Sequence, residues 1–293
     1  MLRVPRLDGL RVPGIRRRPA MSWQQPAERP QVVAHRGSSW VAPEHTLDAY
    51  IKALEDGAEA LECDVRLTAD SHLVCVHDRR IDRTSNGRGV LSALELAQLE
   101  ELDWASRKRP WGELDDEAPE VDQSRGSILT LERLFDTVHD WGRPVDLAIE
   151  TKHPTRYAGL VEQRLVELLD RYGWARPRRG HASPARVMSF SWISLRRCLE
   201  MAPALEMVYL MDRVPLRFRD GTLPLGSRVA GPSLDIVKAH PEYVEKAHAA
   251  GNAVHVWTVN GAVDVEMCAS LGVDAVITDD PGGALRQLSD RNR

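Results

Sequence analysis

Short apolar runs alternate with helical patterns along the chain from Gln31 onward. β-Branched runs of about four to eight residues are typical of buried strands, and apolar positions three or four residues apart are typical of amphipathic helices. The predicted strands are 31–35, 60–67, 73–77, 145–151, 186–190, 206–210, 228–232, 253–259 and 274–278. The predicted helices include 46–55, 130–141, 157–172, 194–201, 241–250 and 263–271, with Thr46 and Thr130 as N-caps.

Repeated strand–helix units predict an α/β fold with parallel strands and right-handed crossovers. About eight units over roughly 250 residues is the size of a TIM (β/α)8 barrel. A doubly wound open sheet is the alternative, but no GxGxxG fingerprint follows the first strand.

Residues 80–127 interrupt this rhythm with charged and turn-forming stretches such as SNGRG and WGELDDEAPE, and with one short helical pattern near 92–102. A long irregular insertion in a compact domain is usually a functional lid or a disordered loop. Because the insertion directly follows a candidate catalytic residue, we expect it to act as a lid.

The composition is that of a soluble globular chain. It has 293 residues, 43% hydrophobic side chains and a formal net charge of -4, which gives no support for nucleic-acid binding. No apolar run is long enough to span a bilayer. Residues 1–30 carry seven arginines against two acidic residues, so we expect a disordered basic tail before a single barrel domain at 31–293.

The four cysteines are scattered and form no CxxC pair, which fits reduced thiols in a cytoplasmic protein. The sequence leaves open whether the protein forms a homo-oligomer.

Strand alternation places several charged residues at the barrel mouth. In ALECDVRLT, Glu62 and Asp64 share one face, and the apolar residues between and beside them share the other. In VDLAIETKH, the same argument turns Glu150 and Lys152 inward. Three converging carboxylates repel one another, and a bound divalent cation with a preference for oxygen, Mg²⁺ or Ca²⁺, would remove that conflict.

His35 and His77 each end an apolar run, so together they could supply one base and one acid. Three carboxylates and one divalent cation leave about one net negative charge, and a phosphodiester adds another. Arg36 and Lys152 would offset both, with Arg36 offering a fork that matches phosphate oxygens. Asp78 is expected to cap the loop that follows.

An ordered set of motifs resembles the glycerophosphodiester phosphodiesterase family over about residues 31–285. The motifs are AHRG, PEHT, ECDV, VHD running into DRTSNGRG, IETK, VHVWTVN and AVITDDP. The resemblance implies a metal-dependent TIM barrel that hydrolyses glycerophosphodiesters to sn-glycerol 3-phosphate and an alcohol. It assigns catalysis to His35 and His77, one divalent cation to Glu62, Asp64 and Glu150, and substrate binding to Arg36, Glu44, Lys152 and Trp257.

One position departs from the family pattern, because His45 stands where the family usually has Asn. The change costs little if the position only caps the next helix, and it matters if the side chain orders Glu44 or a metal-bound water. Rival interpretations are a lysophospholipase D or sphingomyelinase D type enzyme, a non-cleaving sensor of glycerophosphodiesters, and a metal-dependent sugar isomerase. The sequence does not decide which histidine is the acid, nor whether the nucleophile is water or the glycerol 2-hydroxyl.

Overall fold

Eight parallel strands close into a barrel in the computed structural model, which describes residues 29–105, 126–224 and 226–291. The sheet order runs from β1 through β9, β8, β7, β6, β5 and β4 to β2, and β2 pairs back with β1. The barrel strands are β1 (Gln31–His35), β2 (Ala60–Leu67), β4 (Asp146–Thr151), β5 (Ala185–Ser189), β6 (Glu206–Met211), β7 (Val229–Pro232), β8 (Ala253–Trp257) and β9 (Ala275–Thr278). The predicted TIM barrel is confirmed, and the open-sheet alternative is wrong.

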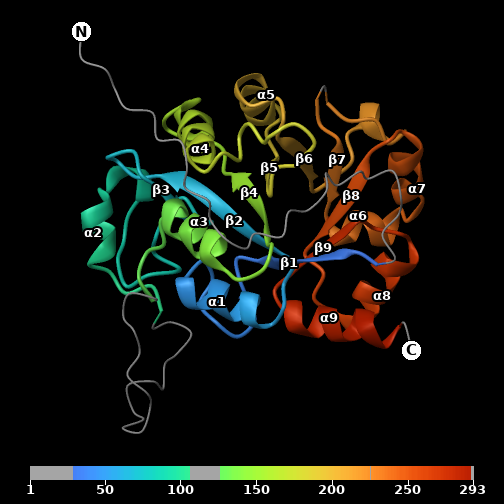
Figure 1. The fold of residues 1–293 in the computed structure, drawn as a ribbon, viewed down its shortest axis with the longest axis horizontal. Coiled ribbons are helices and arrows are strands. Elements are labelled where there is room, and N and C mark those ends of the chain that lie inside the picture. The colour runs from blue at the N-terminus through green and yellow to red at the C-terminus, as the bar shows by residue number, and fades with distance from the viewer. Residues whose placement is uncertain (1–28, 106–125, 225, 292–293) are drawn as a thin grey trace, which may run out of the picture.

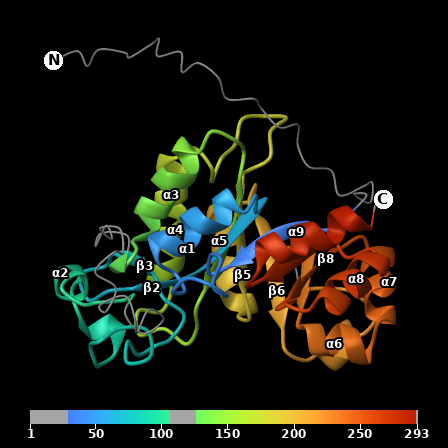
Figure 2. The same cartoon turned by 90° about the horizontal axis from the view of Figure 1, so that it is seen from below.

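Helices cover the outside of the barrel (Figures 1 and 2). They are α1 (Leu47–Glu55), α3 (Leu131–Asp140), α4 (Leu160–Arg171), α5 (Trp192–Met201), α6 (Leu234–Ala239), α7 (Glu242–Ala249), α8 (Ala262–Ser270) and α9 (Pro281–Asp290). The predicted caps are present, since Thr46 accepts a hydrogen bond from the Ala49 N–H and Thr130 from the Arg133 N–H. The sequence pattern did not predict α6 or α9; α9 begins with Pro-Gly-Gly, a combination more typical of turns.

The third predicted strand lies outside the parallel set. β3 (Leu73–Cys75) pairs antiparallel to the far half of β2, from Val65 to Leu67, whereas β1 pairs with the near half, up to Glu62. β2 therefore reaches past the barrel rim toward β3, as Figure 1 shows. The hairpin folds back along β2, so the Val76 N–H donates to the Asp64 carbonyl oxygen at 2.9 Å.

The insertion after β3 has a small core of its own. The predicted helical pattern corresponds to a 3-10 turn, η1 (Leu91–Ala93), and to α2 (Leu96–Glu100). Ile81, Leu91, Leu99 and Trp104 are buried together with Val74, Val76 and Ile128. Residues 106–125 of the predicted lid and residues 1–28 of the predicted basic tail lie outside the described residues.

Two apolar cores lie on either side of the barrel wall. Small and medium side chains such as Val33, Ala60, Ala148 and Val208 fill the interior, and larger ones such as Phe135 and Tyr50 pack between the strands and the helices. A further 3-10 turn, η5 (Leu216–Phe218), lies between β6 and β7. In the described ranges, no helix has both the length and the apolar character needed to cross a membrane.

The cap of α3 gives a test of this local structure. Thr130→Ala removes the acceptor that binds the Arg133 N–H at 3.2 Å, so we expect the free energy of unfolding to fall by about 1 kcal/mol. Thr137→Ala makes the same change inside α3, where alanine is a good helix former, and should leave stability unchanged or slightly raised. Urea denaturation of both variants checks this, and equal stabilities would contradict it.

Candidate active site

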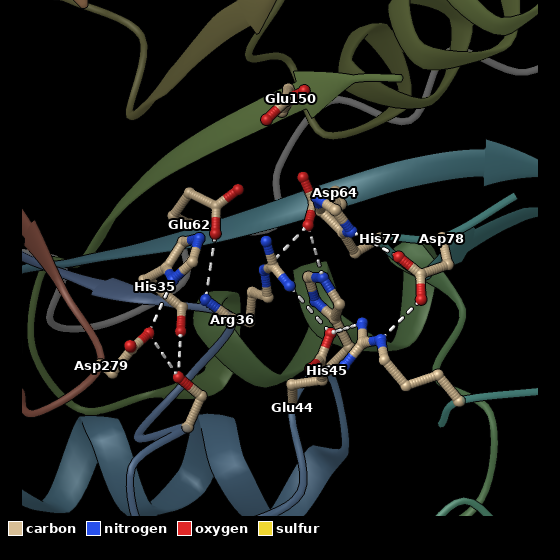
Figure 3. A network of polar contacts seen from close by, with 12 residues as sticks. His35, Arg36, Glu44, His45, Glu62, Asp64, His77, Asp78, Glu150 and Asp279 are labelled. Carbon is tan, nitrogen blue, oxygen red and sulfur yellow. Dashed lines mark hydrogen bonds and ion pairs between the residues drawn. The ribbon is translucent and has the colours of Figure 1, made fainter. Parts of the chain in front are cut away.

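Three buried carboxylates meet at one end of the barrel. Glu62 and Asp64 lie on β2, and Glu150 lies on β4 directly opposite Asp64 in the sheet register. One ligand atom from each residue lies within 4.8 Å of the others, and all three side chains are buried. Figure 3 shows the three on neighbouring strands. The strand alternation therefore placed them correctly on one face.

These carboxylates have strongly divergent affinities for protons. Burial, with the neighbouring charge of Asp64, raises the pKa of Glu150 to about 8 and raises the pKa of Glu62 well above its usual value. Burial opposes ionisation of Asp64 too, but the hydrogen bond from His45 and the charge of Lys152 hold its pKa well below the usual range. Without a bound cation, the three carboxyl groups cannot all be ionised at once. Their oxygen atoms are the ligands that a divalent cation such as Mg²⁺ or Ca²⁺ prefers.

Two cations contact the same carboxylates. Lys152 Nζ lies 2.9 Å from Asp64 Oδ1 and 2.8 Å from Glu150 Oε1. Arg36 Nε lies 3.2 Å from Asp64 Oδ2, and the Arg36 backbone N–H donates to Glu62 Oε2 at 3.0 Å. Both predicted phosphate-binding residues are therefore at the mouth, within reach of an anion held beside the carboxylates.

The turn after β1 depends on backbone that few residues adopt. Arg36 has a φ of 59°, and Gly37 follows with a φ of 87°. A Cβ at Gly37 would lie 2.6 Å from the backbone carbonyl carbon of Ala49, so only glycine allows this close approach to α1. The tight turn is what directs the Arg36 N–H toward Glu62.

His35 lies at the end of β1 with its ring held by a carboxylate. Its Nδ1 is 2.6 Å from Asp279 Oδ1, and Asp279 also accepts hydrogen bonds from Ser39 Oγ at 2.8 Å and Asn260 Nδ2 at 2.7 Å. Burial opposes ionisation of Asp279, but these partners, His35 first, lower its pKa to about 2. A carboxylate on Nδ1 leaves Nε2 as the ring atom available to a substrate.

His77 follows β3 and has the same kind of partner. Its Nδ1 is 2.7 Å from Asp78 Oδ1, and Arg83 Nε donates to Asp78 Oδ2 at 2.6 Å. We expected Asp78 to cap the loop that follows, but its carboxylate oxygens instead contact the side chains of His77 (Figure 3) and Arg83. Burial lowers the pKa of His77, which favours the neutral ring at pH 7.

Glu44 links the first turn of the mouth to the insertion. Its Oε1 lies 3.0 Å from Arg36 Nη1 and accepts a hydrogen bond from Arg83 Nη2 at 2.8 Å. Although burial opposes it, the hydrogen bond from Arg83 and the charge of Arg36 lower the pKa of Glu44 to about 2. Glu44 therefore stays ionised and orients Arg36. The sequence analysis did not identify Arg83, since only the fold brings the insertion to Glu44.

His45, the departure from the family pattern, contacts a carboxylate of the cluster. Its Nε2 is 2.9 Å from Asp64 Oδ2 and its Nδ1 is 2.8 Å from the Tyr50 hydroxyl, while Thr46 makes the helix cap. An ionised carboxylate only accepts, so Nε2 carries a proton. Burial lowers the pKa of His45, and the Tyr50 hydroxyl beside Nδ1 donates to the Glu62 carbonyl oxygen at 3.0 Å. His45 thus orients Asp64 rather than Glu44.

Trp257 ends β8 on the inner side of the mouth. Its Nε1 donates to the Gly231 carbonyl oxygen at 2.8 Å, and its ring meets Phe190 edge to face at 5.4 Å between centroids. It also packs against the interior core. The indole is thereby held rigidly where an apolar part of a ligand could contact it.

Comparisons with known proteins agree on one family. Residues 35–283 match the model of the "Glycerophosphoryl diester phosphodiesterase family". The "Probable glycerophosphodiester phosphodiesterase 1" of Mycobacterium tuberculosis is 43% identical over 272 residues, which cover 92% of this chain and 97% of the relative. The "Glycerophosphodiester phosphodiesterase" of Bacillus subtilis is 30% identical and covers 87% and 85% of the two chains.

Solved structures have the same fold. An Oleispira antarctica phosphodiesterase, solved in complex with the product sn-glycerol-3-phosphate, superposes with a TM-score of 0.75 at 25% identity, covering 89% of this chain and 97% of that one. A putative glycerophosphoryl diester phosphodiesterase from Silicibacter pomeroyi superposes with a TM-score of 0.73 at 26% identity, covering 90% and 96%.

The raised pKa of Glu150 predicts that metal binding releases protons. At pH 7 this carboxyl, with a pKa of about 8, is mostly protonated, and it must ionise to coordinate Mg²⁺ or Ca²⁺. We expect roughly one proton or more released per ion at pH 7, fewer at pH 9, and an affinity that rises with pH through this range. Calorimetric titrations of metal-free protein in two buffers of different ionisation enthalpy measure the release. A binding heat that does not depend on the buffer would contradict this prediction.

The position of His45 predicts an effect on metal affinity. His45→Ala removes the donor that orients Asp64, so we expect the dissociation constant for Mg²⁺ or Ca²⁺ to rise about tenfold. His45→Asn keeps a donor and should lie close to the wild type, and Tyr50→Phe, which removes only the hydroxyl, should have a smaller effect than His45→Ala. Calorimetry measures all three. An unchanged dissociation constant in His45→Ala would show that the contact does not matter.

Proposed function

The chain belongs to the glycerophosphoryl diester phosphodiesterase family, and on that premise we propose that it hydrolyses glycerophosphodiesters to sn-glycerol 3-phosphate and an alcohol by metal-assisted catalysis with two histidines. The observation that carries the mechanism is the convergence of the three carboxylates, His35 and His77 at one mouth. The product-bound relative from Oleispira antarctica supports the same substrate class.

Different charged residues of the mouth would bind the cation and the phosphate. Glu62, Asp64 and Glu150 would hold one Mg²⁺ or Ca²⁺, which supplies positive charge next to the phosphate when bound. Arg36 and Lys152 bind the phosphate oxygens and stabilise the charge that grows on them in the transition state. A fixed guanidinium costs no reorganisation at that moment, and its ion pair with Glu44 keeps Arg36 in place.

The two histidines exchange protons with the reacting oxygens through Nε2, since Asp279 and Asp78 occupy Nδ1. We assign the base to His77, because burial lowers its pKa and keeps the ring ready to accept a proton from the nucleophile. His35 then donates a proton to the leaving alcohol oxygen. Trp257 would contact the glycerol end.

One observation favours a second candidate, a lysophospholipase D type activity on acyl-bearing substrates. Large apolar side chains are exposed at the mouth, among them Trp40 at 65% in the turn after β1 and Trp192 at 44% at the start of α5. Such residues could contact an acyl chain. Rates of release of choline from lysophosphatidylcholine and from glycerophosphocholine distinguish the two candidates.

We also propose that the protein acts in the cytoplasm, because Cys63, Cys75, Cys198 and Cys268 are free and buried. Whether it acts as a homo-oligomer is a question for light scattering of the purified enzyme.

Alanine substitutions test the two-histidine mechanism. His77→Ala and His35→Ala should each lower kcat by about a hundredfold or more, the usual contribution of a general base or acid. A substrate with a p-nitrophenol leaving group needs no proton on its oxygen, so it should recover activity in His35→Ala but not in His77→Ala.

The matched control is His72→Ala, which removes an exposed imidazole from the β2–β3 hairpin and should leave kcat unchanged. Removal of the metal with a chelator should abolish activity, and added Mg²⁺ or Ca²⁺ should restore it. Near-normal turnover in either active-site variant would exclude that histidine from catalysis.

A further inference from the structure

A pocket of about 220 Å³ opens beside the catalytic mouth, between the end of β2, the insertion and the loop after β4. We call it the basic pocket, because its charged lining consists of Arg66, Arg79, Lys152 and Arg156. Ser92 and Thr155 add hydroxyl groups, and none of the described residues that line it is acidic. The lining is thus built for an anion.

The basic pocket adjoins the mouth. A second hollow of about 210 Å³ is lined by His77 and Glu150, and it shares Arg66 and Lys152 with the basic pocket. Arg66 donates from Nε and Nη2 to the His77 carbonyl oxygen at 3.0 and 2.8 Å. A diester whose phosphate lies between His77 and Lys152 therefore needs only a short chain of atoms to reach the basic pocket.

The arginines of the basic pocket differ from those of the mouth in their partners. Arg36 and Arg83 are paired with carboxylates, but within the described ranges the structure records no ion pair between a carboxylate and Arg66, Arg79 or Arg156. Asp64, Glu150 and Asp78 act on Arg66 through space without forming an ion pair with it, and Arg79 adds a like charge nearby. Three arginines gathered without a directly paired carboxylate, next to Lys152, favour a negative ligand that binds them together.

The walls of the basic pocket are held in place. The Tyr157 hydroxyl donates to the Ser92 carbonyl oxygen at 2.7 Å, which ties the loop after β4 to the insertion, and Arg156 lies 5.9 Å over the Tyr157 ring. The described lining contains no aromatic side chain. Quaternary ammonium groups are recognised by aromatic faces and repelled by cations, so choline fits this lining poorly.

We propose that the basic pocket binds a second phosphate, carried by the alcohol half of the substrate. The preferred substrates are then glycerophosphodiesters whose alcohol carries a phosphate group in addition to the scissile diester. Arginine forks match phosphate oxygens in pairs, and the two hydroxyls can donate to the same group. The inference rests on the proposed function, because it assumes that the scissile diester lies at the mouth.

A matched pair of substrates tests it: sn-glycero-3-phosphoglycerol and the same compound with a phosphate on its terminal hydroxyl. We expect kcat/KM to be roughly tenfold higher for the phosphorylated compound at low salt, and the preference to shrink at high ionic strength. Arg79→Gln and Arg156→Gln should each lower kcat/KM for the phosphorylated compound roughly fivefold, as for a partly screened charge pair. Neither substitution should change kcat/KM for sn-glycero-3-phosphoglycerol, whose alcohol is uncharged.

Arg179→Gln is the control, since Arg179 is an exposed arginine in the loop before β5, at the opposite end of the barrel. Equal kcat/KM for the two substrates, or equal losses on both in the pocket variants, would overturn the proposal. Dissociation constants of both compounds measured with His35→Ala give a separate readout. Equal dissociation constants for the two compounds would overturn the proposed role of the basic pocket, even if the wild type turned over neither compound. Tighter binding of the phosphorylated compound, without turnover of either compound by the wild type, would overturn only the proposed function.

Discussion

The mutual repulsion of three buried carboxylates is the constraint around which the mouth is built. Asp64 and Glu150 are opposite one another in the β2–β4 register, so the hydrogen bonds of the sheet prevent them from moving apart. Their charge must instead be offset from the sides, and Arg36, His45 and Lys152 all point to Asp64. The result is one carboxylate that stays ionised between two that hold protons until a cation binds.

The two histidines reach this cluster by different routes. His35 is carried by a barrel strand and takes its carboxylate partner from the end of β9, the next strand in the sheet. His77 comes from outside the parallel barrel, and only the antiparallel direction of β3 returns it to the mouth. The far half of β2 is therefore a functional part of the fold, because it gives β3 an edge to pair with.

Repeated strand–helix units were enough to predict the barrel. Alternation within single strands was enough to predict the inward direction of Glu62, Asp64 and Glu150, and of Lys152 just past the end of β4. The direction of β3 was not predictable, because a short apolar run does not show which neighbour it pairs with. Contacts between distant segments were also hidden. Asp279 lies in the AVITDDP motif, yet only the β1–β9 pairing reveals that it holds His35. Likewise, the arginines of the basic pocket come from three separate segments.

Lys152 connects the carboxylate cluster to the basic pocket, and its role depends on competition with the divalent cation for the carboxylates of Asp64 and Glu150. Its ammonium contacts Asp64 Oδ1 and Glu150 Oε1, and both residues belong to the set that fits a divalent cation. A cation and Lys152 therefore compete for the same negative charge. Without the cation, Asp64 and Glu150 raise the pKa of Lys152 despite burial and keep its ammonium charged. Once a cation offset the charge of these carboxylates, the ammonium would be left to attract an anion on its other side. That side is the one it shares with Arg66.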